Sequence, residues 1–371
     1  MKAVAVFPAE HRCSVIDHPE PRVASPTEVR LRMLDVGICG TDKEIVSFQY
    51  GTPPDGSPYL VIGHESLGEV VEVGAQVTRV KAGDLAVPTV RRPCDVPTCL
   101  ACRAGRQDFC SSAQYTERGI VRRHGFMTEF VVEEERYLNP VPRGLRDVAV
   151  LVEPLTIAEK AVEQMWQVQQ RLPWTVPTGA GVPPAQGRNA LVLGGGPVGL
   201  LGAMKLLLEG FSTTVYSRTP PSCDLDALVT GMGAKFVHAE TVGVAELAGL
   251  IGSIDVVYEA VGASALAYDV MQYLGTNGVF IFTGVPGRKG PNSVDTDRLM
   301  RDAVLKNQMI FGTVNSSVAH FANAVVDLGK FAERWPSAVR SLISHRFPIE
   351  QAGDPLSGKS GGIKNVIAVG N

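Results

Sequence analysis

Hydrophobic and polar residues follow two different patterns along the chain, and the change comes near residue 189. The first 150 residues contain short apolar, β-branched runs separated by Gly, Pro and Asp, as in residues 29–37, 67–74 and 126–134. This spacing is typical of an all-β barrel or sandwich. Residues 155–171 instead repeat apolar side chains near the helical period without Gly or Pro, which predicts a helix.

The second pattern alternates buried strands with helices. Residues 172–188 are rich in Pro and Gly and predict a surface loop, after which residues 189–196 form an apolar strand running into glycines. A helix should follow, with Gly210 at the position where a terminating glycine belongs. Further apolar strands are expected at residues 212–216, 254–260 and 278–284. Alternation of this kind predicts a parallel, doubly wound α/β sheet.

The chain length fits two domains of this kind. At about 150 residues per domain, 371 residues make roughly two domains. The pattern of residues 346–371 again predicts short strands and turns, as in the first domain. The C-terminus is therefore expected to return to that domain. The predicted division is a β-rich domain at 1–155 completed by 345–371, and a nucleotide-binding domain at 156–344.

Composition and charge exclude several classes of protein. Apolar residues make up 45% and charged residues 20%, which gives no support to disordered, collagen-like or coiled-coil proteins. The net charge is −3 and no long run has one sign, so we expect neither nucleic acid nor an anionic membrane as partner. The sequence shows no signal peptide and no apolar run of membrane-spanning length, which predicts a cytoplasmic protein.

Cysteine usage indicates metal binding in a reducing compartment. Four of the seven cysteines, Cys94, Cys99, Cys102 and Cys110, fall within one short segment. Their spacing is compatible with a closed, tetrahedral structural zinc site, and free buried thiols are the alternative.

A second set of metal-ligating residue types is dispersed along the chain. It comprises Cys39, His64, Glu65 and Glu153. A thiolate, an imidazole and a carboxylate could meet around a zinc ion with an open position for an alcohol. Spacing alone does not establish that they meet, and a single Cys or His is more often a packing residue.

A glycine-rich turn between strand and helix predicts a dinucleotide site. The turn has the GxGxxG pattern, with Gly194, Gly196, Pro197, Val198 and Gly199 as the predicted binding residues. Glycines there allow the tight turn and the approach of a pyrophosphate to the backbone. The next strand ends in Ser217 and Arg218 rather than a carboxylate. Arg218 could pair with a 2′-phosphate while Ser217 donates a hydrogen bond, so NADP is expected, with NAD as a possible substitute.

At these residues the chain resembles the zinc-dependent medium-chain dehydrogenase/reductase superfamily, and within it the glucose 1-dehydrogenase branch. The motifs that carry this likeness occur in the family's order along nearly the whole chain. They are ICGTD, IGHESLGEVVEVG, AGRQDFC, ERG, HGFMTEF, EPLTIAEKA, LGGGPVGLLGA and LKNQMIFGTVN. The GHE and GxGxxG elements specify only the superfamily, whereas GRQDFC with HGFMTEF and the LPW loop are typical of glucose dehydrogenases.

The resemblance implies a GroES-like catalytic domain and a Rossmann domain. It implies a catalytic zinc held by Cys39, His64 and Glu153, with Glu65 as a nearby or alternating ligand. The choice between Glu65 and Glu153 stays open. The likeness also assigns a proton relay to Thr41. The four residues between the first two cysteines of the cluster exceed the family's usual two, which leaves Cys94 the least certain structural ligand.

The implied reaction is oxidation of the anomeric hydroxyl of D-glucose, or a related aldose, to the lactone. The resemblance places sugar contacts at Glu117 and Asn307, with Thr41 and Glu153 also facing the substrate, and implies a homodimer or homotetramer. Two rival hypotheses are a polyol or secondary-alcohol dehydrogenase of the same superfamily, and a non-catalytic NADP-binding redox sensor.

Overall fold

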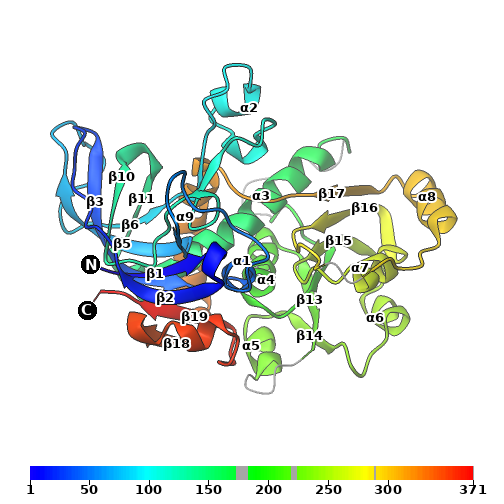
Figure 1. Cartoon of the computed structure of the whole chain (residues 1–371). Helices are drawn as coiled ribbons and strands as arrows, with labels where there is room; N and C mark the ends of the chain where they lie inside the picture. Colours follow the sequence, from blue (N-terminus) through cyan, green and yellow to red (C-terminus); the bar gives the residue numbers. More distant parts are fainter. Residues whose placement is uncertain (173–182, 219–223, 288–289, 371) are drawn as a thin grey trace. The chain divides into compact units, whose positions relative to one another are not determined.

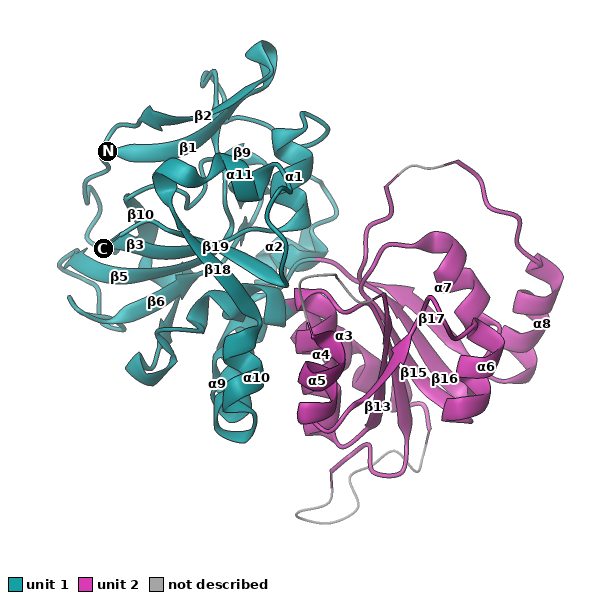
Figure 2. Cartoon of the chain, turned by 90° about the horizontal axis from the view of Figure 1, so that it is seen from below, with its two compact units in different colours: residues 1–156, 315–371 teal, residues 157–314 magenta. Residues whose placement is uncertain are grey.

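The computed structural model describes residues 1–172, 183–218, 224–287 and 290–370, and the chain forms two compact units (Figure 1, Figure 2). Unit 1 comprises residues 1–156 and 315–371, and unit 2 comprises residues 157–314. Most of the predicted surface loop, residues 173–182, lies outside the described residues. Within the described part of the chain, no helix has the length and apolar character needed to cross a bilayer.

Unit 1 is built mainly from antiparallel strands, and its β-rich character agrees with the short apolar runs of the first 150 residues. Its largest sheet has the order β11-β6-β5-β3-β19-β18, with β10 also paired to β3. Smaller sheets have the orders β2-β1-β4 and β7-β8-β9. Alternate residues of the central strand β3, such as Val29, Leu31 and Met33, are fully buried, because side chains of a strand alternate between its two faces. The strands of unit 1 are β1 (Lys2–Phe7), β2 (Arg12–Asp17), β3 (Glu28–Gly37), β4 (Leu60–Val61), β5 (Glu65–Val73), β6 (Leu85–Pro88), β7 (Arg91–Arg92), β8 (Thr116–Arg118), β9 (Arg122–Arg123), β10 (Phe130–Glu134), β11 (Leu138–Val141), β18 (Ile343–Pro348) and β19 (Lys364–Ala368).

Helices of different lengths accompany the strands of unit 1. The predicted helix at 155–171 is observed as α3, which begins at the end of the first segment of unit 1 and continues into unit 2. The helices are α1 (Gly40–Val46), α2 (Leu100–Arg103), α3 (Val152–Gln169), α9 (Val318–Arg334), α10 (Pro336–Ser341) and α11 (Gly353–Leu356). The short 3-10 turns include η2 (Gln107–Phe109), η4 (Arg143–Leu145) and η5 (Ala149–Leu151).

Unit 2 is the predicted doubly wound parallel sheet. Its strand order is β14-β13-β12-β15-β16-β17, and every pair is parallel. Apolar residues of the central strands, among them Leu191, Val257 and Phe280, are fully buried and form one core with the helices. Gly210 follows α4 in the left-handed conformation, with φ of 98°, and terminates that helix as predicted. The elements are β12 (Asn189–Leu193), α4 (Pro197–Glu209), β13 (Ser212–Ser217), α5 (Leu225–Gly231), β14 (Lys235–His238), α6 (Val244–Ile251), β15 (Ile254–Glu259), α7 (Ser264–Met271), β16 (Leu274–Phe282), α8 (Thr296–Leu305) and β17 (Met309–Gly312).

The second boundary between the units differs from the prediction. The chain returns to unit 1 at Asn315, whereas the sequence pattern places that return at residue 345. The reason is α9, whose buried residues Phe321, Leu328 and Phe331 lie on a helix that contacts β11, η4 and η5 of unit 1. The helical period of α9 resembles that of the preceding βα units, so only its packing partners reveal which unit it joins.

Candidate active site

Three of the dispersed candidate ligands lie together in unit 1. Cys39 stands immediately before α1, and His64 and Glu65 lead into β5. One potential ligand atom from each residue lies within 4.8 Å of those of the other two. His64 and Glu65 are buried, with 5% and 1% of their surface exposed. A thiolate, an imidazole and a carboxylate in such a group match the ligand types that zinc prefers.

Asp42, which the sequence pattern did not single out, lies beside two residues of this group. Its fully buried carboxylate accepts a hydrogen bond from the Cys39 backbone N–H at 2.8 Å and lies 3.5 Å from Nδ1 of His64. Burial lowers the pKa of His64, but the neighbouring Asp42 and Cys39 together raise the pKa well above its usual value. A carboxylate beside one ring nitrogen leaves the other nitrogen for a metal ion. The signal in the sequence was the Asp of the CGTD motif, which follows the ligand cysteine by three residues.

Glu65 is held by a buried cation that the sequence analysis also missed. Nζ of Lys364, in β19, lies 2.8 and 2.6 Å from the two carboxylate oxygens of Glu65 and 3.0 Å from the carbonyl oxygen of Ile38. The Lys364 side chain is 3% exposed. Burial lowers the pKa of Lys364, but Glu65, Cys39 and Glu153 together raise this pKa above its usual value. The Glu65 carboxylate is therefore compensated by Lys364 before any metal binds.

Glu153 and Thr41 lie beside the same group. Burial raises the pKa of Glu153 to about 7, the nearby His64 opposes this shift, and Glu65 adds to it. Glu153 is thus close enough to both residues to feel their charges, although it is outside the group defined by the 4.8 Å separation. Oγ1 of Thr41 lies 3.9 Å from Sγ of Cys39.

The four clustered cysteines converge in a lobe between β7 and β8. The potential ligand atoms of Cys94, Cys99, Cys102 and Cys110 lie within 4.8 Å of one another, so the long first gap does not remove Cys94 from the group. The backbone N–H of Cys94 donates to Sγ of Cys102 at 3.4 Å. Backbone hydrogen bonds from Cys102 and Ser111 lower the pKa of the Cys99 thiol to about 5, which favours the thiolate that a zinc site requires.

The segment that leads into His64 is fixed by the chain around His124. Nδ1 of His124 accepts a hydrogen bond from the backbone N–H of Val61 at 3.1 Å, and its ring stacks on Tyr59 with centroids 5.2 Å apart. A Cβ on Gly125 would lie 2.4 Å from the carbonyl oxygen of Gly63, so the two backbones meet without room for a side chain. His124 therefore helps to place the residue before the candidate ligand.

We predict an acid-sensitive contribution of His124 to stability. Burial, His18 and Arg118 lower its pKa to about 4, below the ordinary value of about 6.5. The native state therefore resists protonation, and its stability falls as the pH decreases from about 6.5 toward 4. Because the ring is partly exposed, we expect an effect of about 1 kcal/mol, or about 3 °C in Tm.

The measurement is Tm between pH 7.5 and 4.5 for the wild type and for His124→Gln. The variant keeps an acceptor for Val61 but cannot titrate, so its Tm should fall less steeply with acid. His345→Gln, at an exposed histidine of β18, serves as the control and should follow the wild type. Parallel Tm curves for wild type and His124→Gln would refute the prediction.

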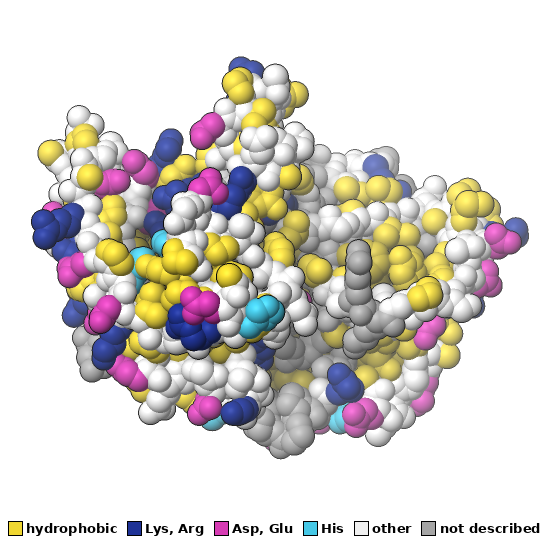
Figure 3. Space-filling view, viewed as in Figure 1, with side chains coloured by type: hydrophobic (Ala, Val, Ile, Leu, Met, Phe, Trp, Pro, Cys, Tyr) yellow, Lys and Arg dark blue, Asp and Glu magenta, His cyan; other side chains and the backbone are white. Residues whose placement is uncertain are grey.

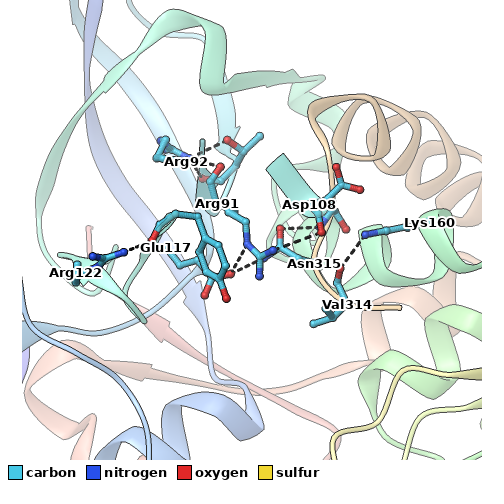
Figure 4. A network of polar contacts seen from close by, with 11 residues as sticks. Arg91, Arg92, Asp108, Glu117, Arg122, Lys160, Val314 and Asn315 are labelled. Atoms are coloured by element: carbon cyan, nitrogen blue, oxygen red, sulfur yellow. Dashed lines mark hydrogen bonds and ion pairs between the residues drawn. The ribbon is translucent and has the colours of Figure 1, made fainter. Parts of the chain in front are cut away.

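Glu117 lies in a polar network of unit 1 (Figure 4). Its Oε1 accepts hydrogen bonds from Nε of Arg91 at 2.9 Å and from Nδ2 of Asn315 at 2.7 Å. Asn307, the predicted sugar contact, lies between α8 and β17 in unit 2, where its carbonyl oxygen accepts a hydrogen bond from Arg171 at 2.7 Å. Both asparagines belong to the motif LKNQMIFGTVN, and the structure shows that the second one contacts Glu117.

The glycine turn of unit 2 has the geometry that the pattern predicts. Gly194 has φ of 111°, a conformation that side chains disfavour. A Cβ on Gly199 would lie 2.1 Å from the Gly194 carbonyl oxygen, so this glycine permits close packing of helix on strand. A Cβ on Gly196 would meet no atom within 4 Å, which leaves open space beside the backbone. Pro197 and Val198 open α4, whose N-terminus favours an anion.

Ser217 contacts the glycine turn through its hydroxyl group. Its hydroxyl accepts a hydrogen bond from the Gly195 N–H at 2.9 Å and donates to the Arg218 carbonyl oxygen at 3.1 Å. The hydroxyl proton is thus directed to the backbone, and Ser217 orients the glycine turn. Arg218 is exposed at the end of β13, so its guanidinium is accessible to a phosphate.

Comparisons with known families match both parts of the chain. Residues 25–143 match the alcohol dehydrogenase GroES-like domain. Residues 146–369 match the family described as glucose dehydrogenase C-terminus. The second match includes both the parallel sheet and the returning C-terminal segment.

Relatives of similar length are named glucose 1-dehydrogenase. The protein from Methanocella arvoryzae is 37% identical over 371 residues, and the alignment covers 100% of both proteins. The protein from Thermoproteus tenax is 38% identical over 373 residues, with all of this chain and 99% of that protein covered. A solved structure of Haloferax mediterranei glucose dehydrogenase, in complex with NADP, Zn and gluconolactone, has a TM-score of 0.86 and 32% identity, with both chains fully covered.

Proposed function

The chain belongs to the glucose dehydrogenase family of zinc-dependent medium-chain dehydrogenases, and on this premise we propose that it oxidises the anomeric hydroxyl of D-glucose to the lactone with NADP as hydride acceptor. The observation that carries the proposal is the group of Cys39, His64 and Glu65 within 4.8 Å of one another. The named ligands of the Haloferax structure support the choice of sugar, metal and dinucleotide.

The ligand set fits a catalytic zinc ion. Cys39 and His64 would hold it together with a carboxylate, from Glu65 or Glu153. Zinc in such a site supplies Lewis acidity, which lowers the pKa of a coordinated hydroxyl. Asp42 lies 3.5 Å from the imidazole of His64 and favours its present orientation by charge, and Lys364 holds the carboxylate of Glu65 through hydrogen bonds. The four cysteines of the lobe would hold a second, structural zinc ion.

Other residues of unit 1 would transfer the proton and bind the sugar. Thr41, beside Cys39, would accept the proton released from the reacting hydroxyl and pass it outward. Glu117 would accept a hydrogen bond from another sugar hydroxyl, because its Oε2 has no hydrogen-bond partner among the described residues. Asn307 is proposed as a further sugar contact, and Asn315 of the same motif would support Glu117, to which it donates.

The glycine turn of unit 2 would bind the dinucleotide. The open space beside Gly196 and the N-terminus of α4 suit a pyrophosphate, and Arg218 suits a 2′-phosphate. NADP, when bound, accepts the hydride, and NAD is expected as a weaker substitute. The chain's own task is to hold the pyrophosphate with backbone groups and to select the 2′-phosphate with Arg218.

A steady-state screen of aldoses and polyols with both dinucleotides tests the proposed function. Glucose, galactose and xylose should be oxidised, with glucose and NADP giving the highest kcat/KM. Efficient oxidation of a polyol with no aldose activity would instead assign the chain to a polyol dehydrogenase. Dinucleotide binding without turnover of any alcohol would favour a non-catalytic sensor.

We also propose that unit 2 forms a homo-oligomer through its β17 edge. β17 is the last strand of the parallel sheet. Large apolar side chains are exposed on it and on α8, where hydrophobic atoms gather in Figure 3. They include Met300, Val304, Leu305 and Ile310. An open edge with an apolar surface favours pairing with a second copy.

The six described cysteines are free thiols, which supports a cytoplasmic location.

A further inference from the structure

Arg91 has no assigned role, yet it is placed to control Glu117. The two residues are directly opposite each other in the antiparallel pair of β7 and β8. Both are buried, Arg91 with 7% and Glu117 with 4% of its surface exposed. Nε of Arg91 donates to Oε1 of Glu117 at 2.9 Å (Figure 4).

Arg91 is itself fixed by two further contacts. Its guanidinium lies over the ring of Tyr115, 3.7 Å from the ring centroid. Its Nη1 donates to the carbonyl oxygen of Asp108, at 3.4 Å, in the turn that leads to Cys110. A planar guanidinium stacked on an aromatic ring has little freedom to rotate. The cysteine lobe and β8 therefore hold Arg91 in one orientation.

The donors around Glu117 leave one of its oxygens free. Arg91 and Asn315 both donate to Oε1, and the Asn315 amide oxygen accepts from the Ser316 N–H at 2.8 Å. Oε2 has no hydrogen-bond partner in the described part of the chain. A carboxylate held at one oxygen by two donors presents its second oxygen in a fixed direction as a hydrogen-bond acceptor.

We propose that Arg91 is a positioning residue for sugar binding, which fixes the Glu117 carboxylate so that Oε2 accepts a hydrogen bond from a substrate hydroxyl. The proposal rests on the proposed function, because it takes Glu117 as a sugar contact. It requires no contact between Arg91 and the sugar. Its consequence is that Arg91 determines KM for the sugar, while the hydride-transfer step and dinucleotide binding depend on other residues.

The neighbouring Arg92 provides a matched control. It is also an arginine of β7 and is 4% exposed, but its Nη1 donates to Thr89 and its Nη2 lies 2.8 Å from Glu133. Adjacent residues of a strand face opposite sides. Removing Arg92 therefore removes the same buried charge without touching Glu117.

The experiment compares Arg91→Met, Arg91→Lys and Arg92→Met, first for folding by near-UV circular dichroism and then for kinetics. We expect Arg91→Met to raise KM for glucose at least tenfold, with kcat changed by less than threefold and the Kd for NADP unchanged. The tenfold value follows from the loss of the charged hydrogen bond between Arg91 and Glu117. Arg91→Lys should recover part of the loss. Arg92→Met should lower Tm and leave KM within twofold of wild type.

A double-mutant cycle with Glu117→Gln separates positioning from general destabilisation. If Arg91 acts through Glu117, the effects of Arg91→Met and Glu117→Gln on KM are far from additive. Independent, additive effects would overturn the proposal, as would a folded Arg91→Met variant with the wild-type KM or an equal rise in KM for Arg92→Met. If Arg91→Met does not fold, Arg91→Lys decides alone, because the proposal requires its KM to rise. A wild-type protein that oxidises no aldose would reject the proposed function instead.

Discussion

Cys39→Ala is expected to abolish turnover and to leave dinucleotide binding intact. The substitution removes the thiolate from the group of three ligands, and two remaining ligands hold zinc poorly. Loss of Lewis-acid assistance is worth several kcal/mol, and each 1.36 kcal/mol is about tenfold in rate. We therefore expect kcat to fall by roughly three orders of magnitude or more, measured with glucose and NADP.

NADP binding serves as the control measurement for Cys39→Ala. The glycine turn proposed to bind NADP lies in unit 2 and includes none of the three candidate zinc ligands. The Kd for NADP, measured by calorimetry, should remain within about twofold of wild type, and the zinc content should fall by about one ion per chain. Cys13→Ala, at a free thiol of β2 outside both cysteine groups, should keep the full zinc content and activity. Retention of both zinc and activity in Cys39→Ala would show that the metal is held elsewhere.

Two alanine substitutions in the glycine turn should have opposite consequences. At Gly199 a Cβ would lie 2.1 Å from the Gly194 carbonyl oxygen, which is backbone and has little room to move. We expect Gly199→Ala to lower the free energy of unfolding by about 2 kcal/mol or more. At Gly196 a Cβ would meet no atom within 4 Å, and φ is −80°. Gly196→Ala should therefore change stability by less than about 0.5 kcal/mol.

Dinucleotide affinity distinguishes the two variants further. Because a pyrophosphate must approach the backbone at the second glycine, Gly196→Ala should raise the Kd for NADP by about tenfold or more while the protein stays fully folded. Chemical denaturation and calorimetry measure the two quantities. Unchanged NADP affinity in Gly196→Ala would place the pyrophosphate away from this turn, and a fully stable Gly199→Ala would contradict the packing at Gly194.

The sequence predicted those features that depend on neighbours along the chain. The strand, glycine turn and helix at residues 189–210 are observed because the conformations of Gly194 and Gly210 are local requirements. The convergence of Cys94, Cys99, Cys102 and Cys110 also follows from a short segment that can fold back on itself. The identification of Cys39, His64 and Glu65 as one group needed the family resemblance, because a β-sheet brings them together from separate segments.

Residues that act through long-range contacts were not predictable in the same way. Lys364 reaches Glu65 because β19 pairs with β3, a pairing that no local pattern indicates. Asn315 and Asn307 occur in one motif, and only the packing of the chain after β17 shows that Asn315 meets Glu117. The unit boundary at Asn315 also depends on long-range contacts, since α9 has an ordinary helical pattern and its neighbours decide which unit it joins.

The fate of the hydrogen on the anomeric carbon tests the central claim most directly. The zinc-loaded protein would be given NADP and D-glucose with deuterium at C1, and the reduced dinucleotide would be analysed by mass spectrometry and NMR. The account predicts one deuterium per molecule at C4 of the nicotinamide, in amounts equal to the gluconolactone formed. Reduced dinucleotide without deuterium, or no reduction with glucose while another alcohol reacts, would contradict it.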